Sequence, residues 1–246
     1  MRIAFLSDIH ANREAFEAVL ADCESRRVDR FVILGDIVGY GPDPGWCVER
    51  SMALARDGAI VVRGNHEQAL ETPALYMNSA ARAAIDWTAH VLDRRQKAFL
   101  AALPLAERED DRLYLHSEAS APDRFHYVRN AEGAAQHFAG CETRLGFCGH
   151  VHRPALYALG NGGKVTPFTP IAGVAVPLLA QRRWLAVIGS IGQPRDHSPA
   201  AGYAVFDTET CELTFLKVPY DIDATAAKIR AAGLPESLAA RLYEGV

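Results

Sequence analysis

Cysteine and lysine are both scarce in this sequence of 246 residues. The five cysteines are scattered and no two form a C-x-x-C pair, which argues against a disulfide framework and a cysteine-rich zinc site. Four of the 26 basic residues are lysines, and the formal net charge is −4. Charge alone therefore does not favour binding of a nucleic acid polymer.

Long apolar runs are also missing. No stretch of about 18 apolar residues occurs, so we expect no membrane association. The first residues contain polar side chains and no small-residue cleavage site, which argues against a secretory signal and predicts a cytoplasmic protein. Hydrophobic residues make up 49% of the chain and charged residues 23%, a composition too apolar for disorder. We predict a single domain over residues 1–246 with one large core.

The first part of the chain alternates apolar strands with amphipathic helices. Strands are predicted at 2–7, 31–34 and 59–62, and a helix at 13–26. A second helix is predicted to follow the Gly- and Pro-rich loop 39–45 and to end at about residue 56. This order predicts an α/β fold in which the strands are parallel neighbours.

The later part mixes both patterns. A helical segment, which we interpret as an insertion, is predicted at about 78–104, and the last 25 residues or so are predicted to be helical. The remaining predicted strands are 113–115, 144–148, 155–159, 184–189, 202–207 and 211–218, with a hairpin turn at 160–163.

Polar side chains follow five of these strands. They are Asp8, His10, Asp36, Asn65, His66, His116, His150 and His152. Carboxyl ends of parallel strands meet at one sheet edge, and these residue types are ligands of divalent metals. Asp-x-His, Gly-Asp and Gly-Asn-His are each unspecific alone and Gly-His-x-His is moderately specific, but their joint occurrence predicts a metal site. The set is too large for one ion and suits two ions that share a carboxylate.

The spacing of these residues supports the same prediction. We expect Asp8 and His10 to be a strand-like i, i+2 pair on one side of the chain. His150 and His152 either share one ion or divide between two. Gly35, Gly64 and Gly149 precede candidate ligands, where close backbone approach is needed.

The motifs resemble those of the calcineurin-like metallophosphoesterases, in particular small bacterial members. The residues that carry the resemblance are Asp8-x-His10, Gly35-Asp36, Gly64-Asn65-His66-Glu67, His116, Gly149-His150-x-His152, and the late segments 189–195 and 203–207. The resemblance implies two packed mixed β-sheets flanked by helices, in four layers.

The resemblance also implies a role for each motif residue. Asp8, His10 and His152 would bind the first ion, and Asn65, His116 and His150 the second. Asp36 would bridge both ions. His66 would contact the phosphate and protonate the leaving group, oriented by Asp36 or by Glu67. In one departure from the family pattern, Ser117-Glu118 follows His116 where many members have Gly-Ser.

The implied activity is hydrolysis of phosphate esters by in-line attack of a metal-bridging hydroxide. We expect a phosphodiesterase acting on small nucleotide-type substrates. A phosphomonoesterase, a protein phosphatase, a dinucleoside polyphosphate hydrolase and a metal-binding regulatory protein without turnover stay open. The resemblance favours two divalent or mixed-valence ions of manganese or iron, while zinc, cobalt and nickel are compatible with the ligands.

Substrate contacts are less clearly marked. Arg63 and Arg153 adjoin ligand motifs and could bind phosphate, and Tyr40 could line the pocket. Gln193 and Arg195 lie in the late segment and are candidates for a substrate or structural role. His126 and His197 are kept as further pocket candidates. The sequence is compatible with a homodimer but does not predict one.

Overall fold

Two six-stranded β-sheets form the centre of the computed structural model, which describes residues 1–72 and 77–246. The first sheet has the order β3 (Ile60–Val61), β2 (Arg30–Ile33), β1 (Arg2–Leu6), β11 (Ala201–Asp207), β12 (Glu212–Val218) and β9 (Ala175–Pro177). The second has the order β4 (Ala106–Glu109), β5 (Arg112–Leu115), β6 (Leu145–Cys148), β10 (Arg183–Val187), β7 (Ala155–Leu159) and β8 (Val165–Phe168).

Both sheets are mixed. β1, β2 and β3 are parallel, as predicted, whereas β11 runs antiparallel to β1. In the second sheet, β5, β6 and β10 are parallel and the outer strands are antiparallel. The motifs identified in the sequence follow the carboxyl ends of β1, β2, β3, β5 and β6.

The two faces of β1 show how the layers pack. Ile3 and Phe5 point into the cluster between the sheets, where the Phe5 ring stacks on Phe147 of β6 at a centroid distance of 4.0 Å. Ala4 and Leu6 point the other way, into the cluster beneath the helices. This alternation follows the two-residue period of a strand, and burial of both faces explains why residues 3–6 of β1 are all apolar.

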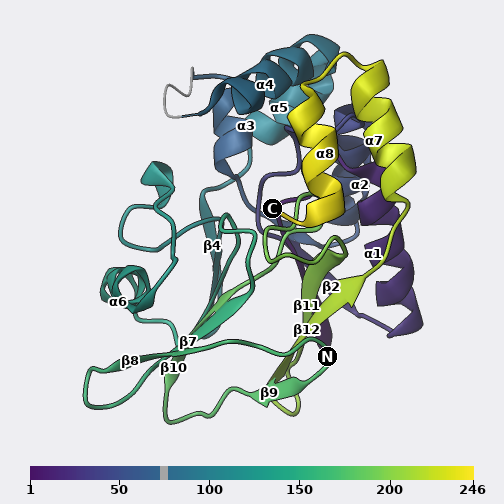
Figure 1. Cartoon of the computed structure of the whole chain (residues 1–246). Helices are drawn as coiled ribbons and strands as arrows, with labels where there is room; N and C mark the ends of the chain where they lie inside the picture. The colour runs from purple at the N-terminus through teal and green to yellow at the C-terminus, as the bar shows by residue number, and fades with distance from the viewer. Residues whose placement is uncertain (73–76) are drawn as a thin grey trace.

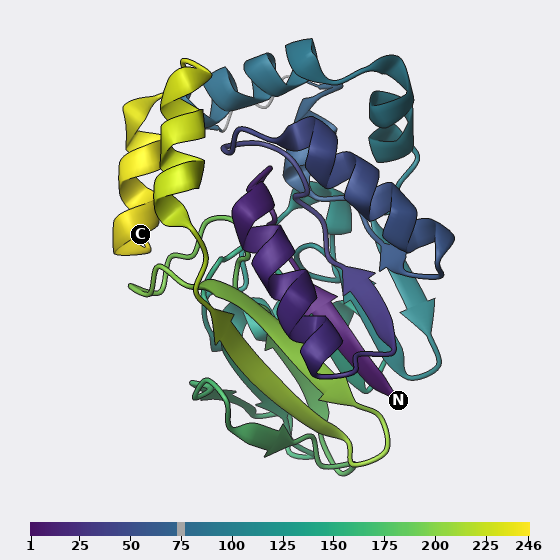
Figure 2. The ribbon, with the colours of Figure 1, turned by 90° about the vertical axis from the view of Figure 1, so that its right-hand side faces the viewer.

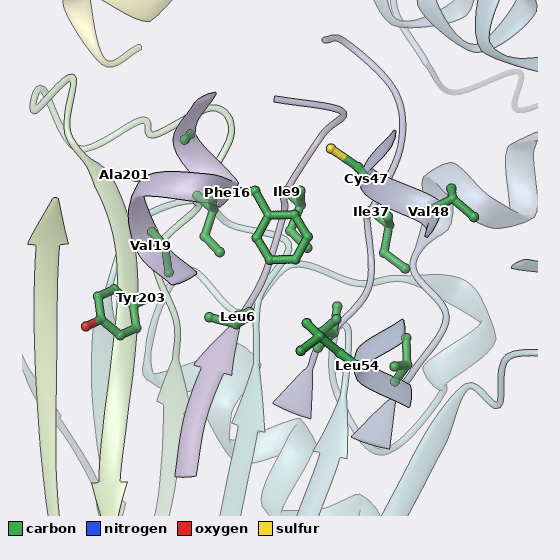
Figure 3. Close-up of a cluster of buried hydrophobic side chains, with 14 of the residues drawn as sticks. Leu6, Ile9, Phe16, Val19, Ile37, Cys47, Val48, Leu54, Ala201 and Tyr203 are labelled. Atoms are coloured by element: carbon green, nitrogen blue, oxygen red, sulfur yellow. The ribbon is translucent and has the colours of Figure 1, made fainter. Parts of the chain in front are cut away.

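Helices cover the outer face of each sheet. α1 (Arg13–Ser25) and α2 (Pro44–Arg56) pack on the first sheet, and Figure 3 shows Phe16 and Val19 of α1 directed toward Leu6 of β1. α6 (Ala131–Gly140) covers the second sheet. The predicted arrangement of two mixed sheets flanked by helices is confirmed.

The helical segment predicted at about 78–104 contains two helices. α4 (Ser79–Val91) ends at Leu92, whose backbone is extended, and α5 (Arg94–Ala101) begins after Asp93. Asp93 and Gln96 cap each other's backbone N–H groups, and this capping box ends one helix and starts the next.

Two C-terminal helices, α7 (Ile222–Ala231) and α8 (Glu236–Glu244), form an antiparallel pair beside α4 (Figures 1 and 2). Ala84 of α4 packs against Ile229 of α7 and Leu238 of α8. This contact places α8 above the carboxyl edge of the first sheet. No helix among the described residues is long and apolar enough to cross a membrane.

Several short elements were not predicted. They are α3 (Asn65–Ala69), the 3₁₀ turn Pro122–Arg124, α6, β4, β8 and β9. The edge strands carry weak apolar patterns because they are partly exposed, and α6 is rich in alanine and glycine, which gives little periodicity.

Candidate metal centre

The loops after β1 and β2 run side by side and bring the first motifs together. Asp8 N–H donates to the Gly35 carbonyl at 3.1 Å, and His10 N–H donates to the Asp36 carbonyl at 2.9 Å. These main-chain bonds continue the pairing of the two strands beyond their ends. They fix the Asp8 loop against the Asp36 loop.

The backbone turns sharply at most of the candidate ligands. Asp8, His10, Asp36, His150 and His152 all have left-handed φ values between 48° and 67°. The prediction that Asp8 and His10 form a strand-like pair is therefore wrong, because β1 ends at Leu6. Non-glycine residues in this region are strained by about 1–3 kcal/mol each and persist only where the surroundings impose them.

One group of four side chains surrounds a common point. It consists of Asp8, His10, Asp36 and His152, all of them buried. His10 Nε2 lies 3.1 Å from His152 Nε2, 3.9 Å from Asp8 Oδ1 and 3.7 Å from Asp36 Oδ2. His152 Nε2 lies 3.3 Å from Asp8 Oδ1. This group could hold one metal ion.

A second group shares Asp36 with the first. His116 Nε2 lies 3.2 Å from Asp36 Oδ2, 3.1 Å from His150 Nδ1 and 3.2 Å from Asn65 Oδ1. All four side chains are buried. His150 and His152 thus divide between the two groups, because the chain turns between them.

The imidazole rings are oriented by main-chain carbonyls. His10 Nδ1 donates to Val38 at 3.1 Å, His116 Nδ1 to Leu34 at 2.7 Å, His152 Nδ1 to Gln193 at 2.6 Å, and His150 Nε2 to Phe125 at 2.9 Å. A carbonyl only accepts, so the proton of each neutral ring lies on the outer nitrogen. The inner nitrogens then face one another with lone pairs, and a shared cation removes that repulsion. The residues therefore fit metal ions.

The charges in the cluster also favour binding of a cation. Burial alone would raise the pKa of the Asp8 and Asp36 carboxyl groups, but the adjacent His152 and His116 hold both well below the usual range. Burial opposes protonation of His116, yet Asp36 outweighs it and raises the pKa of His116 to about 9. Without an ion the cluster takes up a proton at this ring, and a metal ion would displace that proton.

The Glu67 side chain holds the Asp36 loop through main-chain hydrogen bonds. Its buried carboxylate accepts hydrogen bonds from the N–H groups of Asp36, Ile37, Val38 and Gly64 at 2.8–3.2 Å. Burial and the Asp36 charge raise the pKa of Glu67 to about 7, while these donors favour its ionised form. Glu67 is thus engaged by the main chain rather than by His66.

His66 lies beside the cluster but outside both groups. Its Nε2 is 4.0 Å from Asp36 Oδ2, and its backbone N–H donates to Asp36 Oδ1 at 2.9 Å. Of the two carboxylates considered from the sequence, Asp36 is therefore the one near the His66 ring. His66 Nδ1 is buried and has no hydrogen-bond partner among the described residues.

Two glycines let the motif loops approach closely. A Cβ at Gly64 would lie 2.2 Å from Asp36 Oδ1, and one at Gly149 would lie 1.7 Å from Ser7 Oγ. Only glycine fits such contacts without displacing a neighbour. This is the physical reason for glycine before Asn65 and His150.

Glu118, the departure from the family pattern, organises the loop after β5. Its carboxylate accepts from Ser120 N–H at 2.6 Å and Ala121 N–H at 3.1 Å, and His126 Nδ1 lies 3.4 Å away. This loop brings the Phe125 carbonyl to His150. His126 is thereby engaged at the surface and does not line the cavity over the cluster.

A cavity of about 160 Å³ opens onto the cluster. The residues that line it beside the cluster include His66, Tyr40, Tyr127, Arg195 and Arg241. Tyr127 and Arg241 were not identified from the sequence. Arg241 lies on an ordinary amphipathic helix, and no motif marks either residue.

Two predicted phosphate contacts lie elsewhere. Arg63 pairs with Glu71 and is not among the residues that line the cavity. Arg153 lines a neighbouring cavity of about 410 Å³ and donates to the Arg195 carbonyl. His197 is exposed and likewise lies outside the cavity over the cluster. Proximity in sequence to a ligand motif did not place these side chains at the centre.

Comparisons with known proteins agree with this geometry. The family model of the calcineurin-like phosphoesterase superfamily domain matches residues 1–211. A metallophosphoesterase from Sphaerobacter thermophilus is 40% identical, with a TM-score of 0.88 and coverage of 100% of this chain and 99% of that one. An uncharacterized protein of Methanocaldococcus jannaschii is 33% identical over 258 residues, which cover 99% of this chain and 98% of the relative.

A hypothetical protein from Pyrococcus horikoshii shares the fold, with a TM-score of 0.81, 22% identity and coverage of 100% and 98% of the two chains. The family match and the Asp and His cluster together indicate a dinuclear metal site. By its sequence and its fold, the chain belongs to the calcineurin-like phosphoesterase superfamily.

Proposed function

We propose that the protein is a dinuclear-metal-dependent hydrolase of phosphate esters, acting as a phosphodiesterase on small nucleotide-type substrates. The observation that carries the proposal is the pair of ligand groups joined at Asp36, with imidazole lone pairs directed inward. The family match supports the reaction class. The small cavity over the cluster suits the reacting part of a small molecule.

The residues divide into ligands for two ions. Asp8, His10 and His152 would hold the first ion, Asn65, His116 and His150 the second, and Asp36 both. When bound, such ions supply charge for the phosphoryl oxygens and lower the pKa of coordinated water. Mixed imidazole and carboxylate ligation suits manganese or iron.

His66 would act on the leaving side of the phosphate. It lines the cavity next to the shared carboxylate, without joining either ligand group. From there it would contact the phosphoryl group and give a proton or hydrogen bond to the leaving oxygen. Tyr40 packs against the rings of both His10 and His66, at centroid distances of 4.5 and 4.6 Å, and would hold both in place.

Hydrolysis of two model substrates tests the proposal. Purified protein is assayed with bis-p-nitrophenyl phosphate and p-nitrophenyl phosphate, with and without added Mn²⁺. We expect Mn²⁺-stimulated cleavage that favours the diester. Preference for the monoester would overturn the diesterase assignment and favour a phosphomonoesterase. Stable binding of metal with no turnover of either compound would favour the regulatory alternative.

A further inference from the structure

Two arginines from separate parts of the chain face the cavity over the metal centre. Arg195 lies in the loop after β10, and Arg241 lies on α8. The family model ends at residue 211, so α8 lies beyond the matched residues. The C-terminal helix pair therefore adds a cationic side chain that the family motifs do not contain.

Arg195 is positioned by neutral groups. Its Nη2 lies 2.9 Å from Gln193 Oε1 and 3.5 Å from the Tyr40 hydroxyl, and its guanidinium lies 5.9 Å from the centroid of the Tyr40 ring. Its Nε is buried and has no hydrogen-bond partner among the described residues. Arg195 thus reaches the cavity with its charge uncompensated by these contacts.

Arg241 is held in a similar way. It is half-buried, and its Nε donates to the backbone oxygen of Val246 at 2.6 Å. Burial lowers the pKa of Arg241, and the charge of Arg195 lowers it further. Two cations at one cavity repel each other, which favours an anionic ligand between or beside them.

With these two arginines, the positive charge at the cavity exceeds the charge needed to balance one phosphoryl group. Two divalent ions with the carboxylates of Asp8 and Asp36 would leave two positive charges at the centre, which one hydroxide and one phosphodiester monoanion would balance. Asp36 is the one carboxylate among the described residues that line the cavity. The two arginines therefore add positive charge to a cavity whose one lining Asp or Glu side chain among the described residues, Asp36, already belongs to both ligand groups.

We propose that Arg195 and Arg241 bind a second anionic group of the substrate, a phosphate beyond the one that is hydrolysed. This inference rests on the proposed function and narrows it to nucleotide-type phosphodiesters that carry at least one further phosphate. Arginine suits the task because its planar fork binds phosphate oxygens in pairs. Arg241 is then a specificity-determining residue supplied by the C-terminal helix.

Binding of adenosine 5′-monophosphate and adenosine 5′-diphosphate tests the inference without requiring turnover. Calorimetry on the Mn²⁺-loaded protein gives the affinity ratio of the two nucleotides for wild type, Arg195→Gln, Arg241→Gln and Arg241→Lys. Arg230→Gln removes an equally charged side chain from α7, where it pairs with Glu236 at the surface, and is the matched control. Thermal unfolding checks that each variant is folded.

We expect wild type and Arg230→Gln to bind the diphosphate about 10- to 100-fold more tightly than the monophosphate. Arg241→Gln and Arg195→Gln should lose most of that ratio, and Arg241→Lys should lose part of it. An equal loss of affinity for both nucleotides would overturn the inference, because the arginines would then bind the phosphate that lies at the metal ions. An unchanged ratio would also overturn it. Absence of hydrolysis by wild type would instead count against the proposed function.

Discussion

His10 Nε2 lies 3.1 Å from His152 Nε2, although each ring gives the proton of its other nitrogen to a main-chain carbonyl. Two lone pairs at this distance repel unless a cation lies between them. On the other side of Asp36, His116 Nε2 lies 3.1 Å from His150 Nδ1, and there a proton on His116 or a metal ion relieves the repulsion. The cluster is therefore unfavourable without metal ions, and bound ions would stabilise it. The five ligands in left-handed backbone conformations add strain to this region of the fold.

Replacement of His66 by alanine should slow the reaction without emptying the site. We expect kcat to fall about 10²- to 10⁴-fold, because a proton donor to the leaving group is lost. Metal content should stay at the wild-type level, since His66 belongs to neither ligand group. Assays of the model diester and elemental analysis measure both quantities. His90→Ala, at an exposed site on α4, is the control. Loss of metal from the His66→Ala variant would contradict this prediction and indicate that His66 is a metal ligand.

The Glu67→Gln variant should be less stable. The amide NH₂ would face two main-chain N–H groups that now donate to a carboxylate oxygen. Leaving buried donors unpaired costs about 2–4 kcal/mol in the free energy of unfolding. Denaturant titration measures this change. Glu71→Gln, nearby but exposed, should change stability by under about 1 kcal/mol. Equal stability of the two variants would contradict the role given to Glu67.

An added methyl group at residue 149 should disturb the centre. In Gly149→Ala the new Cβ would meet Ser7 Oγ and the Asp8 carboxylate. We expect a loss of about 1–3 kcal/mol in stability and lower metal occupancy, because the His150 loop must move. Gly162→Ala is the matched control, since a Cβ added there would have no neighbour within 4 Å among the described residues. Thermal unfolding at fixed metal concentration distinguishes them, and similar melting temperatures would contradict the prediction.

Acid should weaken the fold through His137, away from the metal centre. Burial lowers the pKa of His137 to about 4, against about 6.5 in the unfolded chain. The unfolded state binds the proton first as the pH falls, so the stabilisation is full above pH 6.5 and is lost between about pH 6.5 and 4. This loss is about 3 kcal/mol.

The difference in pH dependence between wild type and His137→Leu measures this contribution. The variant should lose less stability across that interval, with His90→Gln as the exposed control. Parallel pH profiles for wild type and His137→Leu would contradict the assignment.

Much of the centre could be predicted from the sequence because each ligand follows an apolar strand. Parallel strands bring their carboxyl ends together, so Asp8, Asp36 and Asn65 could be grouped before their positions were known. The way in which they converge could not be predicted. The left-handed turns at His10 and His152 depend on hydrogen bonds to loops distant in sequence.

The cavity around the centre was harder to predict. Arg241 is one charged residue of an amphipathic helix, and the packing of α8 with α7 and α4 in one hydrophobic cluster brings it to the site. Arg63 adjoins a ligand motif yet turns to Glu71. Tertiary packing, rather than sequence proximity, decides which arginines face a substrate.

The number of metal ions per chain, measured in wild type and in Asp36→Asn, tests the central claim most directly. Asp36 joins the two ligand groups, so its replacement should weaken both sites together and abolish activity. Elemental analysis after loading with Mn²⁺ and removal of free metal should give two ions per chain for wild type and fewer than one for Asp36→Asn. Two ions in the variant with full activity, or none in wild type, would contradict a dinuclear centre bridged by Asp36.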